Sequence, residues 1–414
     1  MIWIVAASYA LMTGLLIATW RYRKFLAGAP ATAPSYTPKA AVFVPVPRMA
    51  EAEVDALETL FEQDYPDYEV LFGVVTRRDA AYGRLIALCE RHRGRARVVP
   101  SGPSTKCSDK IQNLLACYDA CHHGTEVLVL MDADLSPDPT LLRRLVQPLV
   151  EPRVGAVTAH RWLAASERSL AGTLASMANA AGLVSVWLSA RACGGVIAIR
   201  RDYFEGLDVP AAWSRAASED IPLCSLLADR GLRIEHADSG LVLSRQLHDW
   251  SSYWNHIVSQ LVMARVYAPT LWWQILCFYL CTVPTGVYGL TRAIARIGGS
   301  ELSAVDVAAM LLPVVFVVQG WILIDGAQHL FARRGEAVAA IPCSWMPAYV
   351  LAMAIGVLQL LASAATSSVV VDGVRYRLDA HDRAAVVRMP LSAARGPSAF
   401  AEASRERARG ARPS

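Results

Sequence analysis

The chain has 414 residues, of which 54% are hydrophobic, and its mean hydropathy is +0.31. This composition is too apolar for an ordinary soluble enzyme of this size, so part of the chain is expected to lie in lipid. The formal net charge of +4 is small, and we expect no nucleic-acid partner.

Four long stretches carry no charged residue: positions 1–20, 270–291, 307–324 and 338–371. Each is long enough for a helix that crosses a hydrocarbon core, which takes roughly 20 residues. We therefore expect an integral, multi-pass membrane protein with one N-terminal span and about three C-terminal spans. A cleaved signal peptide is the alternative for the first stretch, but its basic residues follow the apolar run, whereas those of a signal peptide precede it.

The basic residues Arg21, Arg23 and Lys24 come directly after the first apolar stretch. By the positive-inside rule they place the following polar block in the cytoplasm, and we expect a bacterial inner membrane. Arg333 and Arg334 favour a return to the cytoplasm after the third stretch. Nine cysteines without framework spacing suit a reducing compartment.

The charge distribution divides the chain into five segments. We expect a transmembrane helix at 1–20, a cytoplasmic domain at 25–249 and a C-terminal transmembrane region at 270–371. Segment 250–268 is expected to be an amphipathic helix at the membrane interface, because it carries Trp250, Tyr253 and Trp254. The charged tail 372–414 is expected to be disordered beyond about Pro397.

Short apolar runs alternate with helix-like segments within the polar block. Strands are predicted at 40–47, 68–75, 96–100 and 126–132, and helices with apolar residues at three-and-four spacing at 51–63, 81–93 and 108–122. Alternating strands and helices predict an α/β fold with a doubly wound parallel sheet, whose ligands bind beyond the carboxyl ends of the strands.

Two carboxylates, Asp132 and Asp134 in "MDADLSPDP", follow the fourth predicted strand. The pair fits a hard divalent cation, Mg2+ or Mn2+, that also binds a substrate diphosphate. The alternative is a strand-to-helix loop in which Asp134 or Ser136 caps a helix that begins near Pro139.

Five motifs occur in order: "QDYPDYEVLFGV" (63–74), "SDKIQNL" (108–114), "MDADLSPDPTLL" (131–142), "CGGVIAIRRDYF" (193–204) and "SEDIPL" (218–223). This layout resembles family 2 glycosyltransferases of the ceramide glucosyltransferase type, and the bacterial hopanoid-associated glycosyltransferases share it. The resemblance covers nearly the whole chain and implies a GT-A-like nucleotide-sugar-binding domain anchored by transmembrane helices. It implies transfer from a UDP-sugar donor to a membrane-lipid acceptor at the bilayer.

The resemblance also implies roles for individual residues. Asp220 would be the general base that takes a proton from the acceptor hydroxyl. Asp134 and Asp132 would hold the metal and the diphosphate. The remaining substrate-binding candidates are Asp79 near the uridine, Lys110, Gly194, Gly195, Glu219, Gln260 and Arg265. Asp79 is nearly as well explained as a helix cap, and Lys110 as a solvated helix lysine.

The chain departs from the family pattern in "QLVMAR", where Val262 and Met263 stand at the places of an Arg-Trp pair. Val371 and Asp372 likewise replace a tryptophan and an arginine.

The best-supported acceptor is ceramide. The alternatives are a hopanoid polyol with UDP-N-acetylglucosamine as donor, and a non-catalytic homologue that binds a lipid or a partner. The spacing of Cys117, Cys121, His122 and His123 matches no standard zinc-binding pattern, so we expect no zinc site there. Paired carboxylates also occur in glycoside hydrolases, but that chemistry needs no membrane bundle, so we do not expect a hydrolase.

Overall fold

The computed structural model describes residues 1–28, 36–46, 49, 51–164, 169–244, 249–299, 301–336, 338, 341, 345, 347–378 and 386–388. Its main sheet has the strand order β3-β2-β1-β4-β7-β6-β8-β5. The strands are β1 Ala40–Pro45, β2 Tyr68–Val74, β3 Ala96–Pro100, β4 Val127–Met131, β5 Leu135–Ser136, β6 Val154–Leu163, β7 Val196–Arg200 and β8 Arg233–Ser244. A smaller antiparallel sheet joins β9 Ser368–Val371, β10 Val374–Leu378 and β11 Val386–Arg388.

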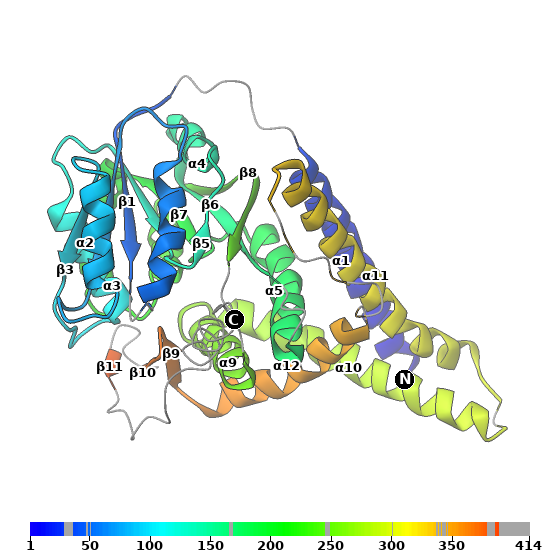
Figure 1. The fold of residues 1–414 in the computed structure, drawn as a ribbon. Helices are drawn as coiled ribbons and strands as arrows, with labels where there is room; N and C mark the ends of the chain where they lie inside the picture. Colours follow the sequence, from blue (N-terminus) through cyan, green and yellow to red (C-terminus); the bar gives the residue numbers. More distant parts are fainter. Residues whose placement is uncertain are drawn as a thin grey trace, which may run out of the picture.

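The helices cover the sheet or extend away from it (Figure 1). Those of the sheet domain are η1 Glu51–Phe61, α2 Tyr82–Arg91, α3 Asp109–Ala120, α4 Leu141–Val146, η2 Gln147–Val150, α6 Arg201–Gly206, α7 Val209–Trp213 and α8 Asp220–Asp229. The others are α1 Ile2–Ala27, α5 Leu170–Leu188, α9 Trp250–Tyr267, α10 Pro269–Ile297, α11 Ala304–Arg333 and α12 Pro347–Ala365.

The four strands predicted from the sequence are confirmed as β1 to β4, and they pair in parallel. Every residue of β1 and β4 is buried, as expected of strands that are covered on both faces. The segment predicted as an α-helix at 51–63 is instead a 3-10 helix, η1. Among its buried residues, Val54, Leu57 and Leu60 recur every third position, which matches three residues per turn, and Phe61 at its end is also buried.

The other half of the sheet is mixed, whereas the sequence predicted a parallel sheet. Strand β7 is antiparallel to both β4 and β6. Helix α5, which connects β6 to β7, packs against α1, α11 and α12 and does not cross back over the sheet. The chain therefore re-enters the sheet from the carboxyl edge of β4, and β7 runs in the opposite direction.

Four of the described helices are long and apolar enough to cross a membrane: α1, α5, α11 and α12. Three of them match the expected stretches 1–20, 307–324 and 338–371. The expected stretch 270–291 lies in α10, which is not among these four. The stretch is uncharged but contains Trp, Tyr, Thr and Gly residues of low hydropathy, and the helix continues through Arg292 and Arg296. Helix α5 lies within segment 25–249, which we expected to be one cytoplasmic domain. The uncharged stretch 169–190 could have indicated this apolar helix.

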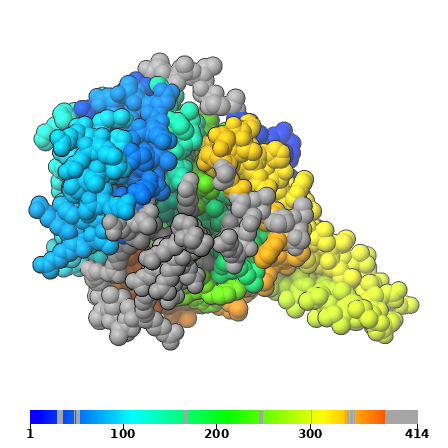
Figure 2. Space-filling model, viewed as in Figure 1, coloured from blue at the N-terminus to red at the C-terminus, as the bar shows by residue number. Residues whose placement is uncertain are grey.

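Helices α10 and α11 form a hairpin whose far end projects beyond the rest of the molecule (Figures 1 and 2). Large apolar side chains are exposed along it, among them Leu290, Ile294, Ile297 and Leu311. An exposed apolar surface of this kind is costly in water and favourable in a hydrocarbon core. The hairpin therefore has the surface of a segment that is embedded in lipid.

The opposite end of α11 returns to the sheet domain. Arg333 donates hydrogen bonds to the last carbonyl groups of α1, at Leu26 (2.9 Å) and Ala27 (3.1 Å). Arg334 donates to Leu241 O of β8 at 2.8 Å and also to Ser239 O. Helices α1 and α11 thus end on the same side, beside the sheet.

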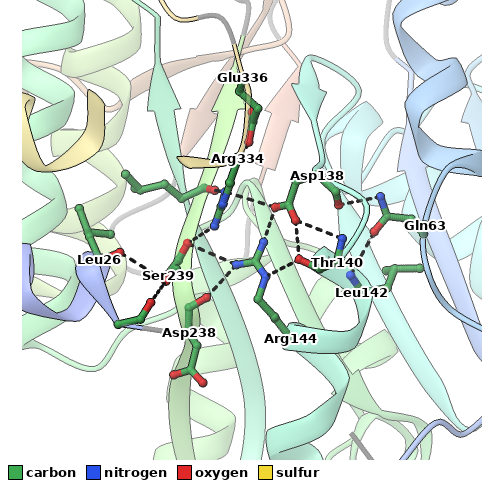
Figure 3. A network of polar contacts seen from close by, with 12 residues as sticks. Leu26, Gln63, Asp138, Thr140, Leu142, Arg144, Asp238, Ser239, Arg334 and Glu336 are labelled. Atoms are coloured by element: carbon green, nitrogen blue, oxygen red, sulfur yellow. Dashed lines mark hydrogen bonds and ion pairs between the residues drawn. The ribbon is translucent and has the colours of Figure 1, made fainter. Parts of the chain in front are cut away.

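A buried polar network joins these helix ends to the sheet (Figure 3). The Asp138 carboxylate pairs with Arg144 of α4 and lies 3.2 Å from Nη1 of Arg334. Arg144 also donates to Asp238 O at 2.7 Å, and the Ser239 hydroxyl donates to Gly28 O at 2.9 Å. The Asp138 carboxylate therefore joins two guanidinium groups from different parts of the fold, and Glu336 lies 3.6 Å from Arg334 as a second carboxylate.

We expect Asp138→Ala to lower the free energy of unfolding by about 3–5 kcal/mol, because it leaves the buried Arg144 guanidinium group without a carboxylate, whereas Arg334 keeps Glu336. Asp64→Ala is the control, because its pair with Arg143 is on the surface and should contribute no more than about 1 kcal/mol. Both variants would be unfolded with denaturant in detergent. Equal effects of the two substitutions would contradict the network's role.

Candidate active site

The carboxyl end of β4 brings Asp132 into the centre of a charged cluster. Its backbone N–H donates to Gly195 O at 3.0 Å, which fixes the end of β4 against the start of β7. One carboxylate oxygen lies 2.7 Å from Lys110 Nζ, and the other pairs with Arg161 of β6. Arg161 also lies 3.5 Å from Asp134, which accepts a hydrogen bond from the Ser244 hydroxyl.

Lys110 lies in the first turn of α3, a helix whose start is capped by the Ser108 side chain. Its ammonium group bridges Asp132 and Glu219, with 2.8 Å to the Glu219 carboxylate. Burial alone would lower the pKa of Lys110, but the two carboxylates raise it above its ordinary value. Lys110 is therefore a fixed positive charge shared by two acidic residues.

Glu219 and Asp220 lie side by side at the start of α8. Burial raises the pKa of the Glu219 carboxyl, and the Lys110 ammonium opposes that rise. Asp220 accepts hydrogen bonds from the Ser218 hydroxyl and from the Ile221 backbone at 2.8 Å. These bonds orient one carboxylate oxygen of Asp220 toward its own helix.

Gly194 allows both of these carboxylates to approach the backbone. A Cβ atom at this position would lie 2.8 Å from Glu219 Oε1 and 3.0 Å from Asp220 Oδ2. The resemblance implied that Gly194 binds substrate, and this stays a prediction; in the structure the acidic pair lies against this glycine. Gly195 lies against Arg161: a Cβ atom at this position would lie 3.4 Å from the Arg161 side chain.

Asp372 brings a further carboxylate to the cluster from the turn between β9 and β10. The turn requires positive φ at Asp372 (49°) and Gly373 (74°). The Asp372 residue is exposed at the rim of the cavity, yet the protein atoms around it raise the pKa of its carboxyl above its ordinary value; Lys110 opposes this rise, while Asp132 and Glu219 add to it. The turn belongs to a folded hairpin, so the structure extends past the boundary at 372 where we expected a charged tail. The predicted disorder beyond Pro397 lies outside the described residues.

Sequence reasoning missed Arg161, Ser244 and Asp372 as site residues. Arg161 and Ser244 lie in or at the end of long strands, and no motif marks them. Asp372 was noticed only as a replacement within "VVVDGVRYRL". The sequence pattern that could have indicated the turn at Asp372 is an Asp-Gly pair between two runs of β-branched residues, which is typical of a tight hairpin.

A cavity of about 2220 Å³ extends from this cluster to the apolar helices. Of the predicted site residues, its lining includes Lys110, Asp132, Asp134, Gly194, Gly195, Glu219, Asp220 and Gln260. Helices α1, α5, α9, α10, α11 and α12 supply another part of its wall, with apolar residues such as Leu15, Phe278 and Met353, and the β9–β10 hairpin also contributes. The charged cluster and the membrane-type helices thus share one space.

Two predicted site residues are placed elsewhere among the described residues. Asp79 follows β2 and accepts hydrogen bonds from the backbone and the hydroxyl of Thr76, at 3.0 and 3.2 Å. Arg265 donates to Ala364 O (3.3 Å) and Thr366 O (2.6 Å) at the end of α12. These are contacts of a turn and of a helix C-terminus. Substrate binding by either residue stays a prediction.

Val262 and Met263, where the family pattern fails, are buried against the β9–β10 hairpin. They belong to a cluster that includes Val369 and Tyr376 of this hairpin. The Tyr376 hydroxyl in turn accepts a hydrogen bond of 3.0 Å from the backbone N–H of Asp109, next to Lys110. The two apolar residues therefore help to hold the hairpin that carries Asp372 into the cavity.

The family model of glycosyl transferase family 21 matches residues 2–363. The chain belongs to glycosyl transferase family 21. The sequence motifs had indicated a family 2 glycosyltransferase of the ceramide glucosyltransferase type. Family 21 is the ceramide glucosyltransferase family, so the type is confirmed and the family number is corrected, while the hopanoid-associated subtype stays a prediction.

The chain is also similar to solved structures. A mannosyltransferase from Pyrobaculum calidifontis, in complex with GDP-Man and Mn2+, is 20% identical, covering 87% of this chain and 97% of that chain, with a TM-score of 0.46. Glucosyl-3-phosphoglycerate synthase from Mycobacterium tuberculosis, in complex with Mn2+, UDP and glucosyl-3-phosphoglycerate, is 18% identical. That match covers 56% of this chain and 85% of that chain, with a TM-score of 0.35.

We expect Gly194→Ala to abolish transfer, because the added methyl group displaces the carboxylates of Glu219 and Asp220. Gly206→Ala at the end of α6 is the matched control, since a Cβ there meets nothing within 4 Å. Sugar transfer and thermal unfolding would be measured for both. Wild-type transfer by Gly194→Ala would show that the position of the acidic pair does not matter.

Proposed function

We propose that this protein moves a sugar from a UDP-sugar to a hydroxyl group of a membrane lipid, with inversion at the anomeric carbon. The observation that carries the proposal is the continuous cavity. Asp132, Asp134 and Asp220 line one part of it, and apolar residues of α1, α10 and α12 line another. A polar sugar nucleotide and an apolar lipid could therefore meet in one site.

Asp220 is the proposed general base. The acceptor oxygen attacks the anomeric carbon, its proton passes to the Asp220 carboxylate, and the bond from the sugar to the diphosphate breaks, releasing UDP. A hydroxyl is a poor nucleophile at neutral pH until a positioned base takes its proton in the transition state. The hydrogen bonds from Ser218 and Ile221 hold this carboxylate in a fixed orientation.

Asp134 and Asp132 are the proposed ligands of a Mg2+ or Mn2+ ion. Both line the cavity, and a cation that also binds substrate phosphates needs only one or two carboxylates from the protein. Such an ion supplies positive charge that stabilises the diphosphate leaving group. Lys110 and Arg161 add fixed positive charge beside the same carboxylates.

Ceramide is the acceptor that we propose, with a hopanoid polyol as the second candidate. The lipid would enter from the bilayer between α9 and the other apolar helices, whose side chains continue the cavity wall. Exposed Trp250 and Trp254 of α9 support an interfacial position for this helix. We propose that the sheet domain lies on the cytoplasmic side of a bacterial inner membrane.

The decisive test compares Asp220→Asn with Asp229→Asn. The two residues lie at opposite ends of α8, and Asp229 is exposed to solvent. Loss of the base should lower the rate of transfer on the order of a hundredfold or more, while UDP binding persists. UDP release would be measured with UDP-sugars, Mn2+, and ceramide or hopanoid polyol in micelles. If wild type and Asp220→Asn release UDP equally, the enzyme proposal fails; the lipid that is used decides between the two acceptors.

The proposed metal site is tested by measuring UDP binding, without measuring transfer. Removing divalent ions with EDTA should weaken UDP binding at least about tenfold, which corresponds to ~1.4 kcal/mol. Asp134→Asn should produce a similar loss in the presence of Mn2+, whereas Asp119→Asn on the exposed side of α3 should not. Calorimetric titration with UDP gives the affinities. UDP affinity that is the same with EDTA and with Mn2+ would contradict metal binding.

A further inference from the structure

The membrane-type helix α1 contacts the strand that carries Arg161. Near the end of α1, the Tyr22 hydroxyl lies 2.8 Å from Nδ1 of His160, the residue that precedes Arg161 in β6. Both partners are fully buried, with 1% of Tyr22 and none of His160 exposed. This pair therefore joins α1 to the residue next to a member of the charged cluster.

His160 and Arg161 point to opposite faces of the sheet, because successive side chains of a strand alternate. On one face, the Arg161 guanidinium pairs with Asp132 and lies 3.5 Å from Asp134. On the other face, the His160 ring packs against Tyr22, with 5.6 Å between the ring centroids. A displacement of His160 would therefore be passed directly to Arg161 through the peptide bond that joins them.

Strand β6 has little support from the sheet at this point. Its antiparallel pairing with β7 stops at Ala159, one residue before His160. On its other side, residues 158 and 160 of β6 pair with residues 236 and 241 of β8, so the register shifts in between. Such a shift interrupts the ladder locally. The segment of β6 that begins at His160 therefore depends on contacts from outside the sheet.

Helix α1 also holds the extra residues of β8 at this irregularity. The Ser239 hydroxyl donates to Leu26 O at 3.3 Å and to Gly28 O at 2.9 Å, both at the end of α1. Tyr22 contacts β6 only one turn earlier in the same helix. The end of α1 thus contacts both strands at the place where their pairing is irregular.

Both partners of the Tyr22–His160 hydrogen bond are neutral. Burial and the neighbouring His236 hold the pKa of His160 well below its ordinary value, so its imidazole is uncharged at pH 7. A neutral imidazole nitrogen can donate to a tyrosine hydroxyl or accept from it. Removal of the Tyr22 hydroxyl would therefore delete a directional link and leave every charge of the site in place.

We propose that Tyr22 and His160 are positioning residues that hold the end of β6, and with it the Arg161 guanidinium, against Asp132 and Asp134. This inference rests on the proposed function, in which these two carboxylates bind the metal ion and the diphosphate. Helix α1 then does more than anchor the sheet domain at the bilayer. It also sets the geometry of the sugar-nucleotide site.

The test compares Tyr22→Phe with Tyr9→Phe. Both tyrosines belong to α1, and the Tyr9 hydroxyl donates to Ala308 O of α11 at 2.6 Å, which does not involve β6. Each substitution removes one hydroxyl and one hydrogen bond, so similar losses of thermal stability are expected. With Mn2+ present, Tyr22→Phe should weaken UDP binding about three- to tenfold, the range that one neutral hydrogen bond allows. Tyr9→Phe should bind UDP as the wild type does in the same calorimetric titration.

A second variant removes the other partner of the bond. His160→Leu should weaken UDP binding to a similar extent, and its combination with Tyr22→Phe should be no weaker than either single variant, because the effects of two partners in one interaction do not add. Wild-type UDP affinity in both Tyr22→Phe and His160→Leu would overturn the positioning role. So would an equal loss of UDP affinity in Tyr9→Phe.

Hydrogen exchange separates this inference from the proposed function, because it needs no substrate. In the protein without UDP, Tyr22→Phe should speed amide exchange at residues 160–163 of β6, whereas Tyr9→Phe should not. Unchanged exchange there would overturn the inference. Faster exchange, in a protein whose wild type binds no UDP, would support the link from α1 to β6 and overturn only the proposed sugar-nucleotide site.

Discussion

The site depends on the sharing of one ammonium group. Lys110 bridges Asp132 at the end of β4 and Glu219 at the start of α8, and these residues are far apart in the sequence. Several carboxylates in one cavity repel each other strongly when little water separates them. Lys110 and Arg161 offset that repulsion, so the acidic residues can stay together where the strands end.

The position of this cluster next to the membrane follows from how the sheet is attached. The buried network around Asp138 joins α4 and β8 to the ends of α1 and α11 (Figure 3). Helix α5 leaves the sheet at its carboxyl edge and packs among the same helices. Because α5 leaves at this edge, the chain re-enters the sheet there and β7 runs antiparallel to β4. This places Gly194, just before β7, beside the carboxylates of Glu219 and Asp220.

The sequence predicted much of the fold and part of the site. The strands β1 to β4 were found because buried parallel strands are short apolar runs. Asp132, Asp134, Lys110 and Asp220 could be singled out because they lie in recognisable motifs at element ends; the structure places them in one cavity, and their roles stay predictions. Arg161 could not be found, since an arginine inside a long strand has no local pattern that sets it apart. Helix α5 was missed because its small residues made an uncharged stretch inconspicuous within a polar block.

By itself the sequence determined which segments are apolar, where the parallel strands lie and which family the motifs resemble, because these follow from local composition and spacing. Only the tertiary structure decided that Asp372 joins the cluster, that Arg265 contacts the end of α12, and that Tyr22 of α1 contacts His160 of β6. Each of these depends on elements that are distant in the chain. Their meeting is set by packing between helices and sheet, which no local pattern encodes.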